Sequence, residues 1–298
     1  MRRLSLAVSA TAASLALAAC GSNSLTNTAP SASATVTTSV DAAAAALLPP
    51  AVKAKGTLLV GMDTTYPPVD ALAGDGQTAV GLDVDLFNAV AKTLGLTATY
   101  QTAKFDSIID GVGSGKYDVG VSAFSITDAR KKQAHMVSYF MAGTEWAAPV
   151  GNPKHIDVKS PCGISVAVQT GTTEALQDLP PKVAACEKLG KPLHVDHYDA
   201  QTAANAAVIS GKDDAMLADS PITAYAVKQS TGKLQTIGTI YGSAHYGFVV
   251  SLPNTALANA FAAALKVMYE NGTYTKVLEA WGATQGGIKS FAVDPAVQ

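Results

Sequence analysis

The sequence has few charged residues, few cysteines and none of the short motifs that mark the common enzyme families. Charged residues make up 15% of its 298 residues and the formal net charge is −2, so the composition does not indicate a nucleic-acid-binding surface. The chain contains no G-x-S-x-G elbow, no H-E-x-x-H motif, no P-loop and no G-x-G-x-x-G after a strand. These absences leave little support for catalysis. The apolar content of 48% is enough for a sizeable core, in one large domain or two smaller ones.

The N-terminus has the organisation of an export signal. A basic start at Arg2 and Arg3 precedes an apolar, alanine-rich run over residues 4–19, which is too short for a secure membrane span. The run ends in LAAC, which resembles the bacterial lipobox, where the cysteine is lipidated, for example with palmitate, and becomes the mature N-terminus. An ordinary signal peptide that happens to contain a cysteine is the alternative. We expect a lipoprotein signal peptide over 1–19 and a lipidated Cys20.

The two remaining cysteines, Cys162 and Cys186, form a single pair. In an oxidising compartment we expect a disulfide between them, worth about 3 kcal/mol in the chain-entropy model; two buried thiols are the alternative. No metal site is expected, because the closest histidine pair, His194 and His197, is spaced to face opposite sides of a predicted strand.

Residues 21 to about 50 are rich in Ser, Thr and Ala and almost without charge. Such a composition cannot bury a core, so we expect 20–55 to be the lipidated cysteine and a flexible linker, with the folded body beginning near Gly56.

The folded body shows the same alternation of strands and helices twice. The S-G-K-x-D sequence at Ser114–Asp118 recurs at Ser210–Asp214. Alternation of this type predicts two α/β lobes of similar design. In the first lobe we expect strands over 57–60, 97–100 and 117–121 with helices over 83–94 and 105–112. In the second we expect strands over 163–169, 193–198 and 212–217 with helices over 183–189 and 200–209.

The C-terminal part is longer than the second lobe needs, so we expect it to return to the first. It is predicted to hold strands over 234–237 and 246–250, helices over 221–227, 255–269 and 274–281, and a loose tail over 284–298. Two crossings, near 144–151 and 242–247, would then form a hinge. The expected division is 56–147 with 246–298 for lobe 1, and 148–245 for lobe 2.

Polar residues follow the strand expected over 117–121. Ser122 and Ser125 come at its end, and Arg130 lies in the first turn of a helix that begins at Thr127. Strand ends that face a helix N-terminus bind anions, and the guanidinium fork suits a carboxylate. The stretch therefore predicts a carboxylate clamp; the alternative is that Arg130 pairs with Asp128 or a neighbouring acid on the surface.

The second lobe supplies a complementary set. Thr172 and Thr173 begin a helix and would also favour an anion. Asp219 follows the equivalent strand and would bind an ammonium group, or else cap the helix after it. A clamp facing a carboxylate suits an amino-acid zwitterion, with Phe105 or Tyr66 covering the apolar part of the ligand.

The chain resembles the extracytoplasmic solute-binding proteins of amino-acid ABC importers. The motifs that carry the resemblance span residues 56–281 and are specific as a set. They are Val60-Gly61-Met62-Asp63, Tyr66-Pro67-Pro68, Gly81-Leu82-Asp83-Val84-Asp85-Leu86, Phe105-Asp106, Ser114-Gly115-Lys116-Tyr117-Asp118, Ser125-Ile126-Thr127 with Arg130, Gln169-Thr170-Gly171-Thr172-Thr173, Asp214–Asp219, Asn271-Gly272-Thr273-Tyr274 and Trp281.

The resemblance implies a two-lobed periplasmic-binding-protein-like α/β fold, with a mixed sheet and flanking helices in each lobe and a two-strand hinge. It implies that Arg130, Ser125 and Thr173 hold the ligand α-carboxylate. Asp219 and a backbone carbonyl near Ser122 and Ala123 would take the α-ammonium. The pocket for the ligand side chain would be lined by Asp63, Tyr66, Phe105 and Gln169.

The same resemblance implies a protein that closes on an amino acid outside the membrane and delivers it to a permease, with no cofactor. We expect a monomer. Departures from the family pattern at Val69-Asp70, Ala123 and His135–Met141 leave the ligand open, although Asp63 suits a basic or amide side chain better than an acidic one. The rival hypothesis is a small-carboxylate dehydratase on the same fold, with a general acid or base where Asp219 lies.

Overall fold

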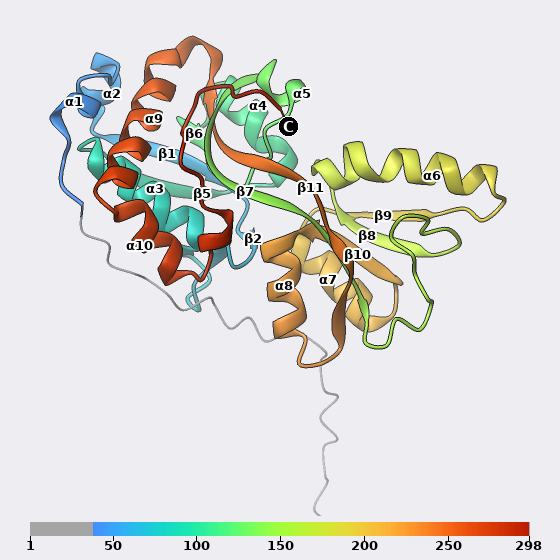
Figure 1. Ribbon diagram of the computed structural model, residues 1–298. Helices are drawn as coiled ribbons and strands as arrows, with labels where there is room; N and C mark the ends of the chain where they lie inside the picture. Colours follow the sequence, from blue (N-terminus) through green and yellow to red (C-terminus); the bar gives the residue numbers. More distant parts are fainter. Residues whose placement is uncertain (1–37, 298) are drawn as a thin grey trace, which may run out of the picture.

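The computed structural model describes residues 38–297 and has a mixed α/β fold in two lobes, as expected (Figure 1). The predicted signal peptide, Cys20 and the linker up to residue 37 lie outside the described residues. One large sheet runs through both lobes, in the strand order β5-β1-β6-β11-β7-β10-β8-β9.

Each lobe has the same arrangement of three parallel strands. In lobe 1 the central strand is β1 (Thr57–Met62), between β5 (Thr97–Thr102) and β6 (Val119–Gly120). In lobe 2 it is β8 (Ser165–Gln169), between β9 (His194–Tyr198) and β10 (Ala215–Asp219). The predicted internal repeat is therefore present in the topology, and it places the carboxyl ends of these parallel strands at the boundary between the lobes.

Two long antiparallel strands join the lobes. They are β7 (Ala134–Pro149) and β11 (Leu234–Ser251), whose pairing shifts register three times between Ile237 and Gly247. The sequence analysis missed β7 and divided β11 into two short strands. Because most of β7 is buried on both faces, its sequence lacks the alternation that would have indicated a strand.

Helices cover the sheet in both lobes (Figure 1). Lobe 1 carries α9 (Thr255–Glu270), which packs a stripe of Leu257, Phe261, Leu265 and Met268 onto the sheet. Phe87 meets Phe261 and Phe248 edge to face, at ring centroid distances of 5.3 and 5.1 Å. This lobe also carries α3 (Leu82–Thr93), α4 (Ile108–Gly113), α5 (Asp128–Lys131) and α10 (Thr273–Ala280).

Lobe 2 carries α6 (Leu179–Lys188), α7 (Gln201–Ser210) and α8 (Ser220–Gln229). A π-helical segment over Glu174–Asp178 leads into α6, so Pro180 and Pro181 lie in the first turn of α6 instead of interrupting it. Smaller elements complete the chain: strands β2 (Thr65–Tyr66), β3 (Asp70–Leu72) and β4 (Ala79–Val80), and 3₁₀ turns at Phe105–Ser107, Leu252–Asn254 and Thr284–Gly286.

The packed body begins earlier than Gly56. Helices α1 (Ala42–Ala45) and α2 (Pro50–Lys55) precede β1, and α1 packs against α9. The Asp41 carboxylate caps α1 by accepting from the Ala44 amide at 2.8 Å, while Ala44 and Leu48 are buried. The expectation of a flexible linker is therefore wrong for residues 38–55, because the few apolar side chains of this segment pack against lobe 1.

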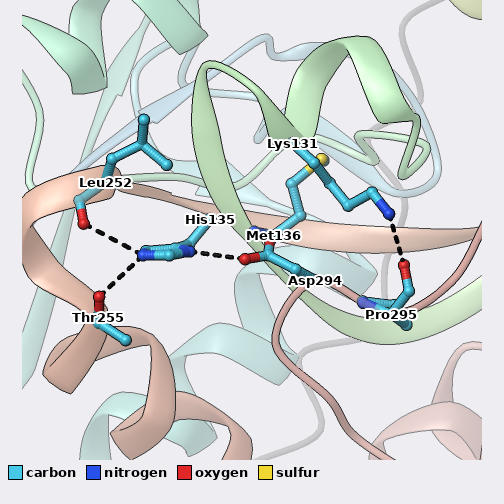
Figure 2. A network of polar contacts seen from close by, with 7 residues as sticks. All are labelled: Lys131, His135, Met136, Leu252, Thr255, Asp294 and Pro295. Atoms are coloured by element: carbon cyan, nitrogen blue, oxygen red, sulfur yellow. Dashed lines mark hydrogen bonds and ion pairs between the residues drawn. The ribbon is translucent and has the colours of Figure 1, made fainter.

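The C-terminal tail is fastened to the start of β7 (Figure 2). His135 Nδ1 lies 2.7 Å from Asp294 Oδ2, and the other oxygen of Asp294 accepts from the Met136 amide at 2.8 Å. Lys131 Nζ donates to the carbonyl of Pro295 at 3.0 Å. The tail was expected to be loose, but the His135 side chain and the Met136 amide of β7, together with Lys131 of α5, hold it in place.

The predicted disulfide between Cys162 and Cys186 is present, with an S–S distance of 2.00 Å, and ties the chain before β8 to α6. Within residues 38–297 no group of three or more His, Cys, Asp or Glu side chains is arranged to hold a metal ion.

Candidate functional site

The strand ends of the two lobes enclose a small cavity of about 10 Å³. Nine of the eleven predicted binding residues line it, together with one that was not predicted, Glu174. The two that do not line it, Asp63 and Ser122, lie behind it and contact each other through the Asp63 amide and the Ser122 hydroxyl at 3.0 Å. The lining residues are Tyr66, Phe105, Ala123, Ser125, Arg130, Gln169, Thr172, Thr173, Glu174 and Asp219.

Arg130 lies in α5, and its amide donates to the Oγ1 of the capping residue Thr127 at 3.2 Å. The guanidinium donates to the carbonyls of Ser125 at 2.8 Å and of Gly171, in the other lobe, at 3.0 Å. It also lies 5.4 Å from the ring centroids of both Phe105 and Phe124. Burial lowers its pKa to about 10, so it is still a cation at neutral pH.

Two of the five guanidinium N–H donors of Arg130 are engaged by carbonyls, which leaves donors that can face a carboxylate in the cavity. The alternative surface pairing with Asp128 is wrong, because Asp128 pairs with Lys131 at 3.0 Å.

Asp219 ends β10 and occupies the N-cap position of α8, yet its side chain makes no capping hydrogen bond. Its Oδ2 accepts from the hydroxyl of Tyr66, in the other lobe, at 2.9 Å, while the Asp219 amide donates to the same Tyr66 oxygen at 3.2 Å. Burial, and next the charge of Glu174, raise the pKa of Asp219 to about 8. A cation placed beside it would favour the ionised form.

Glu174 is the cavity residue that sequence reasoning missed. Its side chain is buried and accepts from the hydroxyls of Thr144, on β7, at 2.8 Å and Thr173 at 3.2 Å. An acidic residue in the first turn of a helix is common because it faces the positive end of the helix dipole. Its identity alone therefore gave no indication that it points into the cleft.

The two threonines differ in what their hydroxyls do. Thr172 Oγ1 donates to the Gln169 carbonyl at 2.9 Å and accepts from the Ala175 amide at 3.2 Å, so it fixes the turn between β8 and the helix. Thr173 Oγ1 donates to Glu174 and lines the cavity.

Further polar contacts bridge the lobes beside the cavity. Gln169 Nε2 donates to the Asp63 carboxylate of lobe 1 and to the Asp199 carbonyl. At the surface Lys104 Nζ lies 2.6 Å from Asp199 Oδ2, with both side chains 64% exposed. The lobes are thus in mutual contact around the cavity, and a ligand larger than this small volume can enter only when they move apart.

The floor of the cleft in lobe 1 rests on two fully buried carboxyl groups. Ser122 Oγ donates to Asp70 at 3.2 Å, and the amide of Ala123 donates to Asp83 at 2.9 Å. Burial raises the pKa of Asp70 well above its ordinary value, with the neighbouring charges of Asp83 and Asp63 adding to the rise. Ala123 has φ 49°, a left-handed conformation that costs a non-glycine residue about 1–2 kcal/mol.

Replacing Asp70 with Asn is expected to stabilise the folded protein increasingly as pH rises. An acid with a raised folded-state pKa stabilises most at low pH, and that contribution is lost between its unfolded and folded pKa values, at ~1.4 kcal/mol for each pH unit. Asn keeps an acceptor for Ser122 without a charge. Urea unfolding at pH 5 and pH 8 checks this, with exposed Glu187→Gln as the control. An equal difference between variant and wild type at both pH values would contradict it.

Comparison with known proteins places this geometry in a family. Residues 58–284 match the bacterial extracellular solute-binding proteins, family 3. The chain belongs to this family. The family 3 protein is 33% identical over 242 residues to the arginine-binding protein ArgT of Corynebacterium glutamicum, which covers 81% of this chain and 79% of ArgT. It is 30% identical to the arginine-binding periplasmic protein of Mannheimia haemolytica, covering 77% of this chain and 93% of that one.

Among solved structures, an ancestral arginine-binding protein bound to arginine matches the family 3 protein with a TM-score of 0.71 and 33% identity, covering 76% of this chain and 98% of that one. These relatives are described as binding proteins. The family 3 protein is thus the extracytoplasmic substrate-binding protein of an amino-acid ABC importer, with the permease as its partner. In the part of the chain that the structure describes, no helix is long and apolar enough to span a membrane.

Proposed function

We propose that this family 3 protein captures a cationic L-amino acid, of which L-arginine is the best candidate, in the cleft between its lobes. The observation that carries the proposal is the charge of the cleft. Three buried carboxyl groups, Asp63, Glu174 and Asp219, surround or adjoin the cavity, and Arg130 is the one cation among its lining residues. A zwitterion with a neutral side chain would leave this excess of acid uncompensated.

The site residues divide into three groups in the proposed complex. Arg130, Ser125 and the Thr173 hydroxyl hold the α-carboxylate. Asp219, with a backbone carbonyl near Ser122 and Ala123, holds the α-ammonium. Asp63, Gln169 and Glu174 supply acceptors for a guanidinium or ammonium side chain, while Phe105 and Tyr66 cover its methylene groups.

Two sources support arginine over other basic ligands. The relatives reported above are described as arginine-binding. A guanidinium also offers five donors in a plane, which matches several carboxylate and amide acceptors better than the compact ammonium of lysine.

The proposed working cycle uses the two long strands as a hinge. Lobe 1 comprises 56–147 and 246–298, extended by the packed residues 38–55, and lobe 2 comprises 148–245. Rotation about β7 and β11 would separate the lobes for ligand entry and bring Arg130 and Asp219 together on closure. The protein is proposed to act as a monomer, held to the membrane by a lipid on Cys20 after removal of residues 1–19.

Calorimetric titration of the lipid-free chain from Gly21 onward, unfolded and refolded to remove bound ligand, tests the proposal. L-Arginine is expected to bind most tightly, L-lysine and L-glutamine more weakly, and L-glutamate at least about tenfold more weakly than L-arginine because its side chain adds to the acid excess. Tighter binding of L-glutamate than of L-arginine would overturn the cationic ligand, and silence across the panel would overturn amino-acid binding.

A further inference from the structure

We propose that Asp83 is a positioning residue for the ligand site: its buried carboxylate holds the Ser122–Ala123 turn in the left-handed conformation that shapes the cleft floor. Asp83 does not line the cavity, and its side chain is fully buried behind it. The role rests on the proposed function, since the turn it holds is the part of lobe 1 that would face the ligand ammonium.

The turn has a conformation that its sequence does not favour. Ala123 has φ 49° and lines the cavity with an exposed fraction of only 3%. Alanine adopts this region at a steric cost that glycine does not have, so the surroundings must impose it.

The contact that imposes it is made by Asp83. Its Oδ2 accepts from the Ala123 amide at 2.9 Å and from the Tyr139 hydroxyl, on β7, at 2.6 Å. Two donors on one buried carboxylate oxygen fix both its position and the direction of the Ala123 amide. A second contact fixes the preceding residue, because Ser122 Oγ accepts from the Asp63 amide and donates to Asp70.

Asp83 lies under the turn because the start of α3 packs closely against the backbone of Val69. Gly81, at φ 143°, precedes α3, and a Cβ at this position would lie 2.0 Å from the Val69 carbonyl oxygen. The Asp83 amide donates to that same carbonyl at 3.2 Å. Glycine therefore lets α3 begin directly beneath the strand ends, where its second residue reaches the floor of the cleft.

The expected effect of Asp83→Ala is a loss of affinity for L-arginine of about tenfold or more, because the Ala123 amide would lose its acceptor and the turn could relax out of the left-handed region. Adding Ala123→Gly to this variant should recover about threefold to tenfold, since glycine adopts the left-handed region without steric cost. A residue that served only global stability would show no such recovery in affinity.

Because Asp83→Ala removes a fully buried group, Tyr139→Phe provides a milder variant, which removes one of the two donors on Asp83. It is expected to weaken L-arginine binding about threefold, and Ala123→Gly should offset that loss. The matched control is Tyr198→Phe, which removes a Tyr–Asp hydrogen bond of the same 2.6 Å length to Asp213 in lobe 2 and should leave affinity unchanged.

Amide hydrogen exchange of ligand-free protein separates this proposal from the proposed function. Exchange at Ala123 should be about tenfold faster or more in Tyr139→Phe than in wild type, and unchanged in Tyr198→Phe. Unchanged exchange at Ala123 in Tyr139→Phe, or no recovery of affinity on adding Ala123→Gly, would overturn the role of Asp83. If wild type binds no amino acid but exchange follows the expected pattern, the proposed function fails while Asp83 still holds the turn.

Discussion

Replacing Arg130 with Met is expected to weaken L-arginine binding by roughly 10²–10³-fold while changing the melting temperature little. Removing one partner of a buried, hydrogen-bonded charge pair costs about 2–5 kcal/mol of binding free energy. In this protein the guanidinium is the one cation among the residues that line the cavity. Without it, the ligand carboxylate would enter a buried site that already holds an excess of acid.

The small change in stability follows from the contacts of the Arg130 side chain. Met retains the apolar packing on Phe105 and Phe124, whose ring centroids each lie 5.4 Å from the Arg130 Cζ. The carbonyls of Ser125 and Gly171 lose a donor, but both lie at the cleft, where water can replace it when the lobes separate.

Lys132→Met is the control for Arg130→Met, since it removes the same charge from an exposed position two residues along the chain. Calorimetric titration and thermal unfolding of both variants complete the measurement. An Arg130→Met variant that binds L-arginine within about tenfold of wild type would show that the carboxylate is held elsewhere.

Binding of L-arginine is expected to tighten about tenfold per pH unit as pH rises from 6 to 8, and to level off above that. Burial and the charge of Glu174 raise the pKa of Asp219 to about 8 in the ligand-free protein. The proposed complex needs the ionised carboxylate beside the α-ammonium. Below pH 8 the ligand must therefore displace one proton, and each pH unit corresponds to about 1.4 kcal/mol.

Proton release can be measured directly by calorimetry in two buffers of different ionisation enthalpy. We expect close to one proton released per ligand bound at pH 6.5, and almost none in Asp219→Asn. The Asn variant should also bind much more weakly at pH 8, because the ammonium would lose its counter-charge. Wild-type affinity that stays constant between pH 6 and pH 8 would contradict the assignment of Asp219.

Two of the predicted residues that line the cavity, Arg130 and Asp219, could be expected there from the order of strands and helices alone. Arg130 and Asp219 follow equivalent strands of a repeated unit, and carboxyl ends of parallel strands meet at one edge whatever the details of packing. The repeat could be read because its strand and helix periods differ, and because the S-G-K-x-D sequence occurs in both halves.

The residues that sequence reasoning missed act through contacts between distant segments. The Asp83 carboxylate accepts a hydrogen bond from the Ala123 amide, forty residues along the chain, and the Glu174 carboxylate accepts one from the Thr144 hydroxyl, thirty residues before it. Strand β7 was not predicted because a strand buried on both faces lacks the alternation of apolar and polar residues that indicates a strand. Such features depend on the direction of a side chain in the folded protein, which neither residue type nor spacing specifies.

The hydrogen bonds that bridge the lobes compete with the ligand, because they use the same groups that would bind it. The Arg130 guanidinium is held by the Gly171 carbonyl, the Gln169 amide by Asp63, and the Tyr66 hydroxyl by Asp219. The guanidinium, amide and hydroxyl, together with Asp63 and Asp219, belong to the proposed ligand site, so a self-closed molecule cannot take up an amino acid. The measured affinity is then the intrinsic affinity of the open form scaled by the fraction of molecules that are open. Altering a surface ion pair such as Lys104 and Asp199 would change the open fraction, and with it the apparent affinity for the amino acid, without changing any atom that touches the ligand.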